Sequence, residues 1–292
     1  MIPRRKLGRD APQVSAVGYG GMHLSIQERP PEEQGIRVIH AALDAGVTLI
    51  DTADVYCLDD REIGHNERLI ARALQTYRGS RDQVIVATKG GMQRPGGRWV
   101  MAGRPEQLRA ACERSLQALA VDQIQLYQLH APDPAVPLAD SVGALADLQR
   151  EGKLRWVGLS NVSVAEIRQA QTIVGVTTVQ NRLNPFFREA LEQGVVEYCT
   201  DQGIGFLAYS PTGGGRLNRK LPAHPVLRPI ATRLGVTPHA LVLAWVLARS
   251  PAVIVIPSAR TVEHAVDSAT AAALNLSPAD LSAITAAEFS RV

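Results

Sequence analysis

Cysteine is scarce in this chain, and the few cysteines form no motif. Cys57, Cys112 and Cys199 are widely separated, odd in number and without a CxxC pair among 292 residues. Isolated cysteines argue against a disulfide scaffold or a structural zinc site, and they favour a reducing compartment. The seven histidines form neither an HxH nor an HExxH pair, the usual signals of a metal-dependent barrel hydrolase. We therefore expect no bound metal and a cytoplasmic location.

Long apolar runs and charge clusters are missing as well. No run approaches membrane-spanning length, and no signal-peptide core follows the first six residues. The net charge of +3 is too small to indicate a nucleic-acid partner, and no cluster of lysine and arginine adds to it. We expect a soluble protein that binds neither nucleic acid nor membrane. Its oligomeric state is not encoded in any pattern that we recognise.

Short β-rich runs that alternate with amphipathic helical patterns are present instead. A hairpin that turns at residues 8–10 precedes them, and helices at residues 238–249 and 278–288 exceed the repeat and are expected outside or below it. Ser163 is a predicted helix N-cap, and Gly46 and Gly152 are predicted helix stops. The expected strands are residues 14–20, 47–51, 84–89, 124–130, 155–160, 177–180, 204–210 and 252–258. The expected helices are residues 32–45, 66–77, 105–119, 138–151, 164–173, 188–202, 225–234 and 261–273.

Eight repeats without a linker indicate one α/β domain over residues 1–292. An open, doubly wound sheet shares this alternation. The repeat number favours a closed (β/α)8 TIM barrel, and so does the absence of a dinucleotide-binding fingerprint, since GYGGMH at residues 18–23 lacks the third glycine of GxGxxG.

Polar residues follow nearly every expected strand, and several of them can act together. Asp51, Lys89 and His130 end three successive strands, and Tyr56 lies in the loop after Asp51. Strand tips of a barrel meet at one mouth, where barrel enzymes have their sites. Taken singly, each residue could be a cap or a rim residue. Taken together, they indicate a site.

These four side chains predict acid catalysis. A tyrosine is a poor acid near neutral pH because its reference pKa is about 10, and a nearby ammonium lowers that value. Lys89 can supply the ammonium, while Asp51 holds it charged and in place. His130 can orient a carbonyl oxygen or relay the proton. This arrangement suits reduction of a C=O group, with the hydride coming from elsewhere.

An ordered set of motifs resembles the aldo-keto reductase family over nearly the whole chain. The matching pieces are DTADVY at 51–56, GHNE at 64–67, ATK at 87–89, YQLH at 127–130, GKLRWVGLSN at 152–161, VQN at 179–181 and AYSP at 208–211. The resemblance implies a barrel that binds NADPH across its mouth and reduces a carbonyl substrate. It also implies that Tyr56 is the proton donor, with Asp51, Lys89 and His130 completing a tetrad.

The resemblance also assigns the cofactor contacts. Ser160, Asn161 and Gln180 match positions that hydrogen-bond the nicotinamide carboxamide, and Tyr209 matches the aromatic residue that stacks on the ring. Arg260 stands beside an expected helix start, an arrangement that suits a 2′-phosphate, so we expect NADPH, with NADH possible. The other expected contacts are Gly21, Met22, Ser210, Pro211, Gly213, Leu217, Ser258, His264, Asp267 and Ser268. Of these, His264, Asp267 and Ser268 depart from the Gln and Glu-Asn pair that the family commonly uses for the adenine.

The substrate is less well defined by the sequence. Trp99 and His23 are candidates for the pocket wall, although the loop at residues 91–103 also reads as a mobile surface loop. The short stretch after the last expected helix resembles bacterial family members without a long C-terminal tail. An open pocket and a small or planar aldehyde, pyridoxal-like among others, are therefore expected. A nicotinamide-binding regulatory module with little turnover is the alternative.

Overall fold

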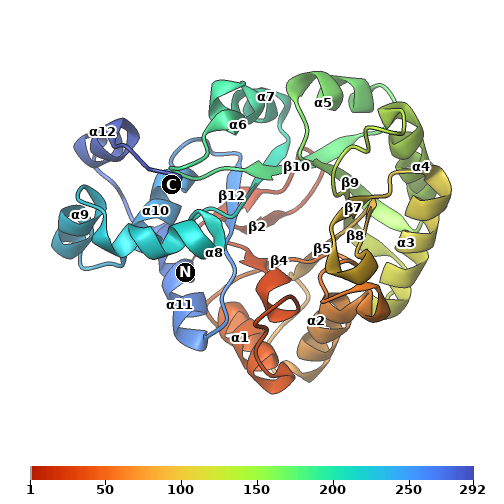
Figure 1. Cartoon of the computed structure of the whole chain (residues 1–292), viewed down its shortest axis with the longest axis horizontal. Coiled ribbons are helices and arrows are strands. Elements are labelled where there is room, and N and C mark those ends of the chain that lie inside the picture. Colours follow the sequence, from red (N-terminus) through yellow and green to blue (C-terminus); the bar gives the residue numbers. More distant parts are fainter. Residues whose placement is uncertain (1) are drawn as a thin grey trace.

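A closed barrel of eight parallel strands forms the centre of the molecule (Figure 1). The structure is a computed structural model that describes residues 2–292. The order around the barrel is β3, β4, β5, β8, β9, β10, β11 and β12. The first and last strands are joined because Gly18 N donates to Val255 O (2.8 Å) and Gly20 N donates to Pro257 O (2.9 Å). The strands are Tyr19–Gly20, Leu49–Asp51, Ile85–Gly90, Ile124–Leu129, Leu154–Ser160, Val176–Arg182, Gly205–Tyr209 and Val253–Ile256. The predicted TIM barrel is confirmed.

Helices surround these strands, and Figure 1 shows α1 to α5 as a ring on one side and α9 to α12 gathered on the other. Several begin or end as the sequence predicts. Ser163 accepts a hydrogen bond from Glu166 N and caps α5, while Gly46 and Gly152 follow α1 and α4 with φ of 96° and 79°. The helices are α1 Glu32–Asp44, α2 His65–Thr76, α3 Pro105–Leu119, α4 Leu138–Arg150, α5 Val164–Gln171, α6 Glu189–Glu192, α7 Val195–Gln202, α8 Gly214–Leu217, α9 Leu227–Leu234, α10 Pro238–Leu247, α11 Val262–Thr270 and α12 Pro278–Ala286.

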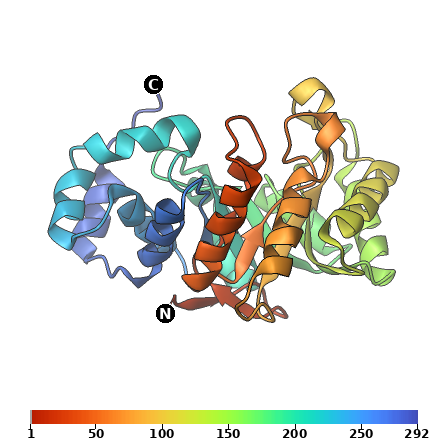
Figure 2. The same ribbon diagram turned by 90° about the horizontal axis from the view of Figure 1, so that it is seen from below.

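The N-terminal hairpin closes the lower end of the barrel. Its strands β1 (Arg4–Lys6) and β2 (Gln13–Ser15) pair antiparallel, and Figure 2 shows them below the barrel. Leu7 and Val14 are fully buried among apolar side chains of the barrel strands. Ser15 N donates to Thr48 Oγ1, just before β4. The hairpin therefore covers the amino ends of the strands, opposite to the mouth.

Some element boundaries differ from those expected. The strand predicted at 14–20 is divided into β2 and β3, because residues 13–15 pair with β1 and only Tyr19 and Gly20 pair with β4. The helix predicted at 188–202 is divided into α6 and α7 because Gly194 takes a left-handed conformation (φ 71°). The expected loop at 91–103 contains a small hairpin, β6 (Met92–Gln93) and β7 (Val100–Met101).

Helix α10 has a different place from the one expected for residues 238–249. It packs against β12 and is buried over Ala240–Leu247, so it belongs to the layer that covers the barrel. Helix α9, predicted as the covering helix, packs against α10 instead. The reason is composition: α10 is apolar on every side, and such a helix must be covered on every side. Within residues 2–292 no single helix is long and apolar enough to cross a membrane; α9 and α10 reach that length and apolarity only as a pair bent by 96°.

Candidate active site

The ammonium group of Lys89 lies at the centre of the predicted tetrad. Its Nζ donates to Asp51 Oδ2 (2.6 Å), to the backbone oxygen of Thr52 (2.8 Å) and to the Tyr56 hydroxyl (3.1 Å). Lys89 is fully buried, and Asp51 and Tyr56 are almost so. A buried charge needs an ion-pair partner and hydrogen bonds, and Lys89 has both. The strand tips thus bring three of the predicted residues into direct contact.

Asp51 is held by a second layer of amides. Gln180 Nε2 donates to Asp51 Oδ1 (2.7 Å), and Gln128 Nε2 lies 3.4 Å from the same oxygen. The resemblance assigned Gln180 to the nicotinamide; the structure adds its hydrogen bond to the carboxylate of Asp51, and the nicotinamide contact stays a prediction. Gln128 and Thr52 are not among the site residues expected from the sequence. Their signal was available in part, since Gln128 is a polar residue inside an apolar strand that ends at the site.

His130 completes the group through its ring. The Tyr56 and His130 rings meet edge to face with their centroids 5.8 Å apart. The centroid of the Trp99 ring lies 6.3 Å from each of these two centroids. Burial and, to a lesser degree, the Lys89 charge hold the pKa of His130 well below its usual range. Among the described residues, its buried Nδ1 has no hydrogen-bond partner. The imidazole is therefore neutral at physiological pH.

The net pKa shift of Tyr56 is opposite to the one expected from its lysine neighbour. Burial raises the pKa of Tyr56 above its ordinary value of 10.0 and outweighs the lowering effect of Lys89. For Lys89, burial alone would lower the pKa, but Asp51 and then Tyr56 raise it overall. The phenol and the ammonium therefore both keep their protons at neutral pH.

A cavity of about 1090 Å³ opens above the tetrad. Many of the predicted residues line it, namely Met22, His23, Asp51, Tyr56, Trp99, His130, Ser160, Asn161, Gln180, Tyr209, Ser210, Pro211, Ser258, Arg260 and His264. The predicted residues outside this lining are Gly21, Lys89, Gly213, Leu217, Asp267 and Ser268. Lys89 lies beneath Tyr56, and Asp267 accepts a hydrogen bond from Thr237 Oγ1 instead (2.7 Å). The cofactor roles of the other residues stay predictions.

The polar residues on one side of this cavity are linked to one another. The Tyr209 hydroxyl donates to Asn161 Oδ1 (2.8 Å), and Asn161 Nδ2 donates to the backbone oxygen of His130 (2.9 Å). Ser160 Oγ donates to the backbone oxygen of Gln180 (2.7 Å). Asn161 has a φ of 60°, a left-handed conformation that asparagine tolerates better than most residues. These contacts give the ends of four strands, β8 to β11, a fixed arrangement.

Arginines that the sequence analysis did not single out also line the cavity. They are Arg182, Arg216 and Arg219, which join Arg260 and His264. Arg182 lies over the rings of Phe187 (4.4 Å) and Tyr209 (5.8 Å). A cavity rimmed by guanidinium groups suits a ligand that carries several phosphates. Only Arg182 had a signal in the sequence, since it follows the VQN motif directly.

Comparisons with solved structures define the class of protein. A glycerol dehydrogenase of Gluconobacter oxydans has a TM-score of 0.82 and 28% identity, covering 96% of this chain and 93% of that one. An aldo/keto reductase of Klebsiella pneumoniae, solved with NADP and acetate, has a TM-score of 0.80 and 27% identity, covering 97% and 94%. The fold is that of these TIM-barrel oxidoreductases.

Sequence comparison gives the family. The model of the Aldo/keto reductase family matches residues 16–288. A probable aldo-keto reductase of Glycine max is 34% identical over 305 residues, which cover 94% of this chain and 86% of that protein. The chain therefore belongs to the aldo/keto reductase family of NAD(P)H-dependent oxidoreductases.

Proposed function

We propose that this protein reduces an aldehyde or ketone to the alcohol with NADPH, and that Tyr56 delivers the proton. The observation that carries the proposal is the Lys89 ammonium between Asp51 Oδ2 (2.6 Å) and the Tyr56 hydroxyl (3.1 Å). Residues 1–292 act as one domain in this proposal. When bound, the nicotinamide supplies the hydride.

Each tetrad residue has a distinct role. Burial keeps the pKa of Tyr56 high, so the phenol holds a proton to give to the oxygen that develops negative charge. After the proton is transferred, the phenolate of Tyr56 is stabilised by the positive charge of Lys89, whose Nζ is already 3.1 Å away. Asp51 keeps Lys89 charged. Neutral His130 faces the same phenol and can orient the carbonyl oxygen.

The cavity residues fit NADPH. The volume of about 1090 Å³ and the arginines on the rim suit an extended, multiply phosphorylated ligand. Ser160, Asn161, Gln180 and Tyr209 would hold the nicotinamide end. Arg260 would meet a 2′-phosphate, which favours NADPH over NADH. The reductase from Klebsiella pneumoniae, similar over nearly the whole chain, was solved with NADP.

The substrate proposal rests on the aromatic wall. Trp99 is 45% exposed and stands beside both Tyr56 and His130. A planar aldehyde that stacks on this indole is the class we favour, with pyridoxal as one member to test.

The three cysteines are free and buried, which supports a reducing, cytoplasmic location.

The test is cofactor oxidation over a panel of aldehydes that includes pyridoxal, with NADPH and NADH side by side. We expect NADPH-dependent turnover, and Tyr56→Phe should lower kcat by roughly 10²–10⁴-fold, the scale of a lost general acid. NADPH affinity should change little. Near-normal turnover in the variant would remove Tyr56 from the mechanism. Tight NADPH binding without turnover on any aldehyde would favour the regulatory module instead.

A further inference from the structure

The guanidinium of Arg260 is already occupied by the chain itself. Its Nη1 donates to Glu28 Oε2 (3.0 Å), its Nη2 to the backbone oxygen of Gln27 (3.1 Å) and its Nε to that of His23 (3.4 Å). All three acceptors belong to the segment between β3 and α1. Arg260, the proposed partner of the 2′-phosphate, therefore donates all three of these hydrogen bonds to residues 23–28 of its own chain.

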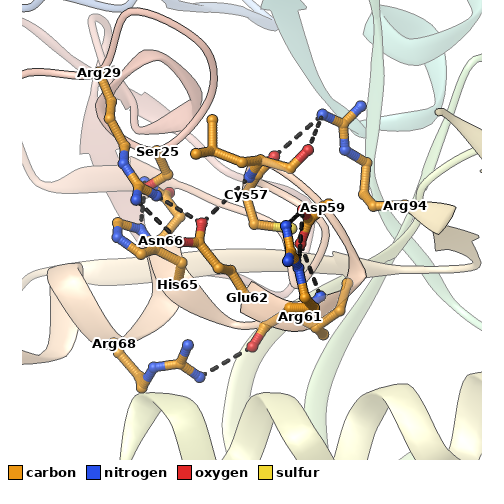
Figure 3. A network of polar contacts seen from close by, with 12 residues as sticks. Ser25, Arg29, Cys57, Asp59, Arg61, Glu62, His65, Asn66, Arg68 and Arg94 are labelled. Atoms are coloured by element: carbon orange, nitrogen blue, oxygen red, sulfur yellow. Dashed lines mark hydrogen bonds and ion pairs between the residues drawn. The ribbon is translucent and has the colours of Figure 1, made fainter. Parts of the chain in front are cut away.

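Glu28 is positioned for this contact by its backbone. It has a φ of 59°, a left-handed conformation that costs most non-glycine residues free energy. The next residue, Arg29, pairs with both carboxylate oxygens of Glu62 (2.7 and 3.0 Å), as Figure 3 shows. Neighbouring residues thus anchor the loop to two different sides, Arg260 on one and Glu62 on the other.

Glu28 also lies in the cofactor cavity. It lines the same cavity as Arg260 and His264, and its side chain is 75% exposed against 35% for Arg260. A phosphate that approaches Arg260 therefore comes close to the carboxylate of Glu28, which is bound to the same guanidinium group. The two anions repel each other and compete for the same donors.

We propose that Glu28 sets the choice between NADPH and NADH by competing with the 2′-phosphate for Arg260; this rests on the proposed function. NADPH binding must release Glu28 from Arg260, and that release reduces its affinity. NADH carries a ribose 2′-hydroxyl instead, which leaves the ion pair intact and can donate to the carboxylate, the way acidic residues recognise NADH elsewhere. Glu28 thus lowers the preference for NADPH.

The test measures dissociation constants of NADPH and NADH by calorimetry for the wild type and Glu28→Gln, at one fixed ionic strength. Removing the charge should tighten NADPH by about 3–10-fold, the scale of one partly exposed ion pair. NADH should bind unchanged or more weakly. The difference should shrink as salt is raised, because the interacting charges are near the surface.

Glu33→Gln is the matched control, because Glu33 is exposed in the first turn of α1 and does not line the cavity. It removes the same charge and should leave both constants unchanged. When Glu28→Gln is combined with Arg260→Ala, it should change the NADPH dissociation constant much less than it does in the wild type. If the preference for NADPH is unchanged or lower in Glu28→Gln, the role of Glu28 is overturned and the proposed function stands. The same holds if NADPH affinity rises equally in Glu33→Gln. A wild type that binds neither dinucleotide overturns the proposed function together with this inference.

Discussion

At the scale of single residues, burial decides the protonation of the site. It raises the pKa of Tyr56 above 10.0 and lowers that of His130 well below 6.5. Both side chains are therefore neutral between about pH 6.5 and 10. The Tyr56 proton is lost only as the pH rises through its raised pKa. The protonated phenol that the proposed mechanism requires is thus present throughout the physiological pH range.

The expected kcat/KM for carbonyl reduction is flat from about pH 6.5 to 9 and falls only at higher pH, where Tyr56 ionises. The measurement is a pH series at constant ionic strength, with NADPH affinity determined at each pH as the control. A fall centred near pH 7 to 8 would mean that another group, or a Tyr56 with a lowered pKa, controls the rate.

A second buried acid lies close to the site without taking part in the tetrad. Both carboxylate oxygens of Asp54 lack a hydrogen-bond partner among the described residues, and Arg114 is 3.7 Å away. Burial, and next the nearby Glu67, raises the pKa of Asp54 well above 3.8. Between pH 3.8 and the raised pKa of Asp54, the folded protein therefore binds more protons than the unfolded chain. Its stability falls as the pH rises from 3.8 through the raised pKa.

Asp54→Asn should remove this pH dependence. We expect a free energy of unfolding at pH 7 that is higher by about 1–2 kcal/mol, because the variant no longer carries the free-energy cost of burying an acid whose pKa is raised. Urea unfolding between pH 4 and 8 measures it. Asp59→Asn is the control, and its effect on the pH dependence of stability should have the opposite sign, because the hydrogen bond from Arg61 lowers the pKa of Asp59. A variant of Asp54 that is less stable at every pH would show that the ion pair with Arg114 dominates.

The residues of the tetrad could be predicted because three of them lie at the ends of apolar strands, Tyr56 lies in the loop after one of these strands, and together they form ordered motifs. Their partners could not. The hydrogen bond from Gln180 to Asp51 joins residues 129 positions apart, and no local pattern reports it. The pair of Arg260 with Glu28 spans 232 positions and needs both loops in place. Long-range polar contacts depend on closure of the barrel.

At the scale of elements, the small hairpin of β6 and β7 gives the mouth its aromatic wall. Arg94 is 1% exposed, and its Nη2 donates to the backbone oxygens of Cys57 (3.1 Å) and Leu58 (3.2 Å). Figure 3 shows the guanidinium of Arg94 directed toward Cys57. Its guanidinium lies 4.0 Å from the centre of the Trp99 ring. The hairpin is thereby fixed to the loop that follows Tyr56.

Arg94→Met should loosen Trp99 and raise KM for aromatic aldehydes by about 3–10-fold, the scale of one cation–π contact, with little change in kcat. Small aliphatic aldehydes should be affected less. Tryptophan fluorescence should report the altered surroundings of Trp99. Arg98→Met, an exposed neighbour, is the control and should change neither value. An equal rise in KM for aliphatic substrates would contradict a stacking role.

Element types were predictable along most of the chain because apolar periodicity and caps agree with each other there. The exceptions have local causes. Gly194 divides a helical pattern that is otherwise continuous, and the hairpin at 91–103 has too few apolar residues to stand out. For α10, the sequence shows an apolar helix but not which neighbour covers it.

At the scale of the whole molecule, stability and function are located at opposite ends of the barrel. The mouth carries the tetrad and the cavity, while the hairpin of β1 and β2 covers the other end. Arg5 donates to the backbone oxygens of Ser250 and Val253, at the start of β12. Leu7 is fully buried between the hairpin and the strands. Barrel enzymes commonly separate the two tasks in this way.

Leu7→Ala should therefore lower the free energy of unfolding by about 2–5 kcal/mol and leave kcat/KM unchanged below the melting range, because the cavity it creates lies far from the mouth. Leu7→Met, which keeps the volume, should cost less than about 1.5 kcal/mol. Urea unfolding and steady-state kinetics on the same samples give both quantities. If kcat/KM falls in Leu7→Ala while the protein is still folded, packing at the closed end also controls the geometry of the tetrad, and the two ends are not independent.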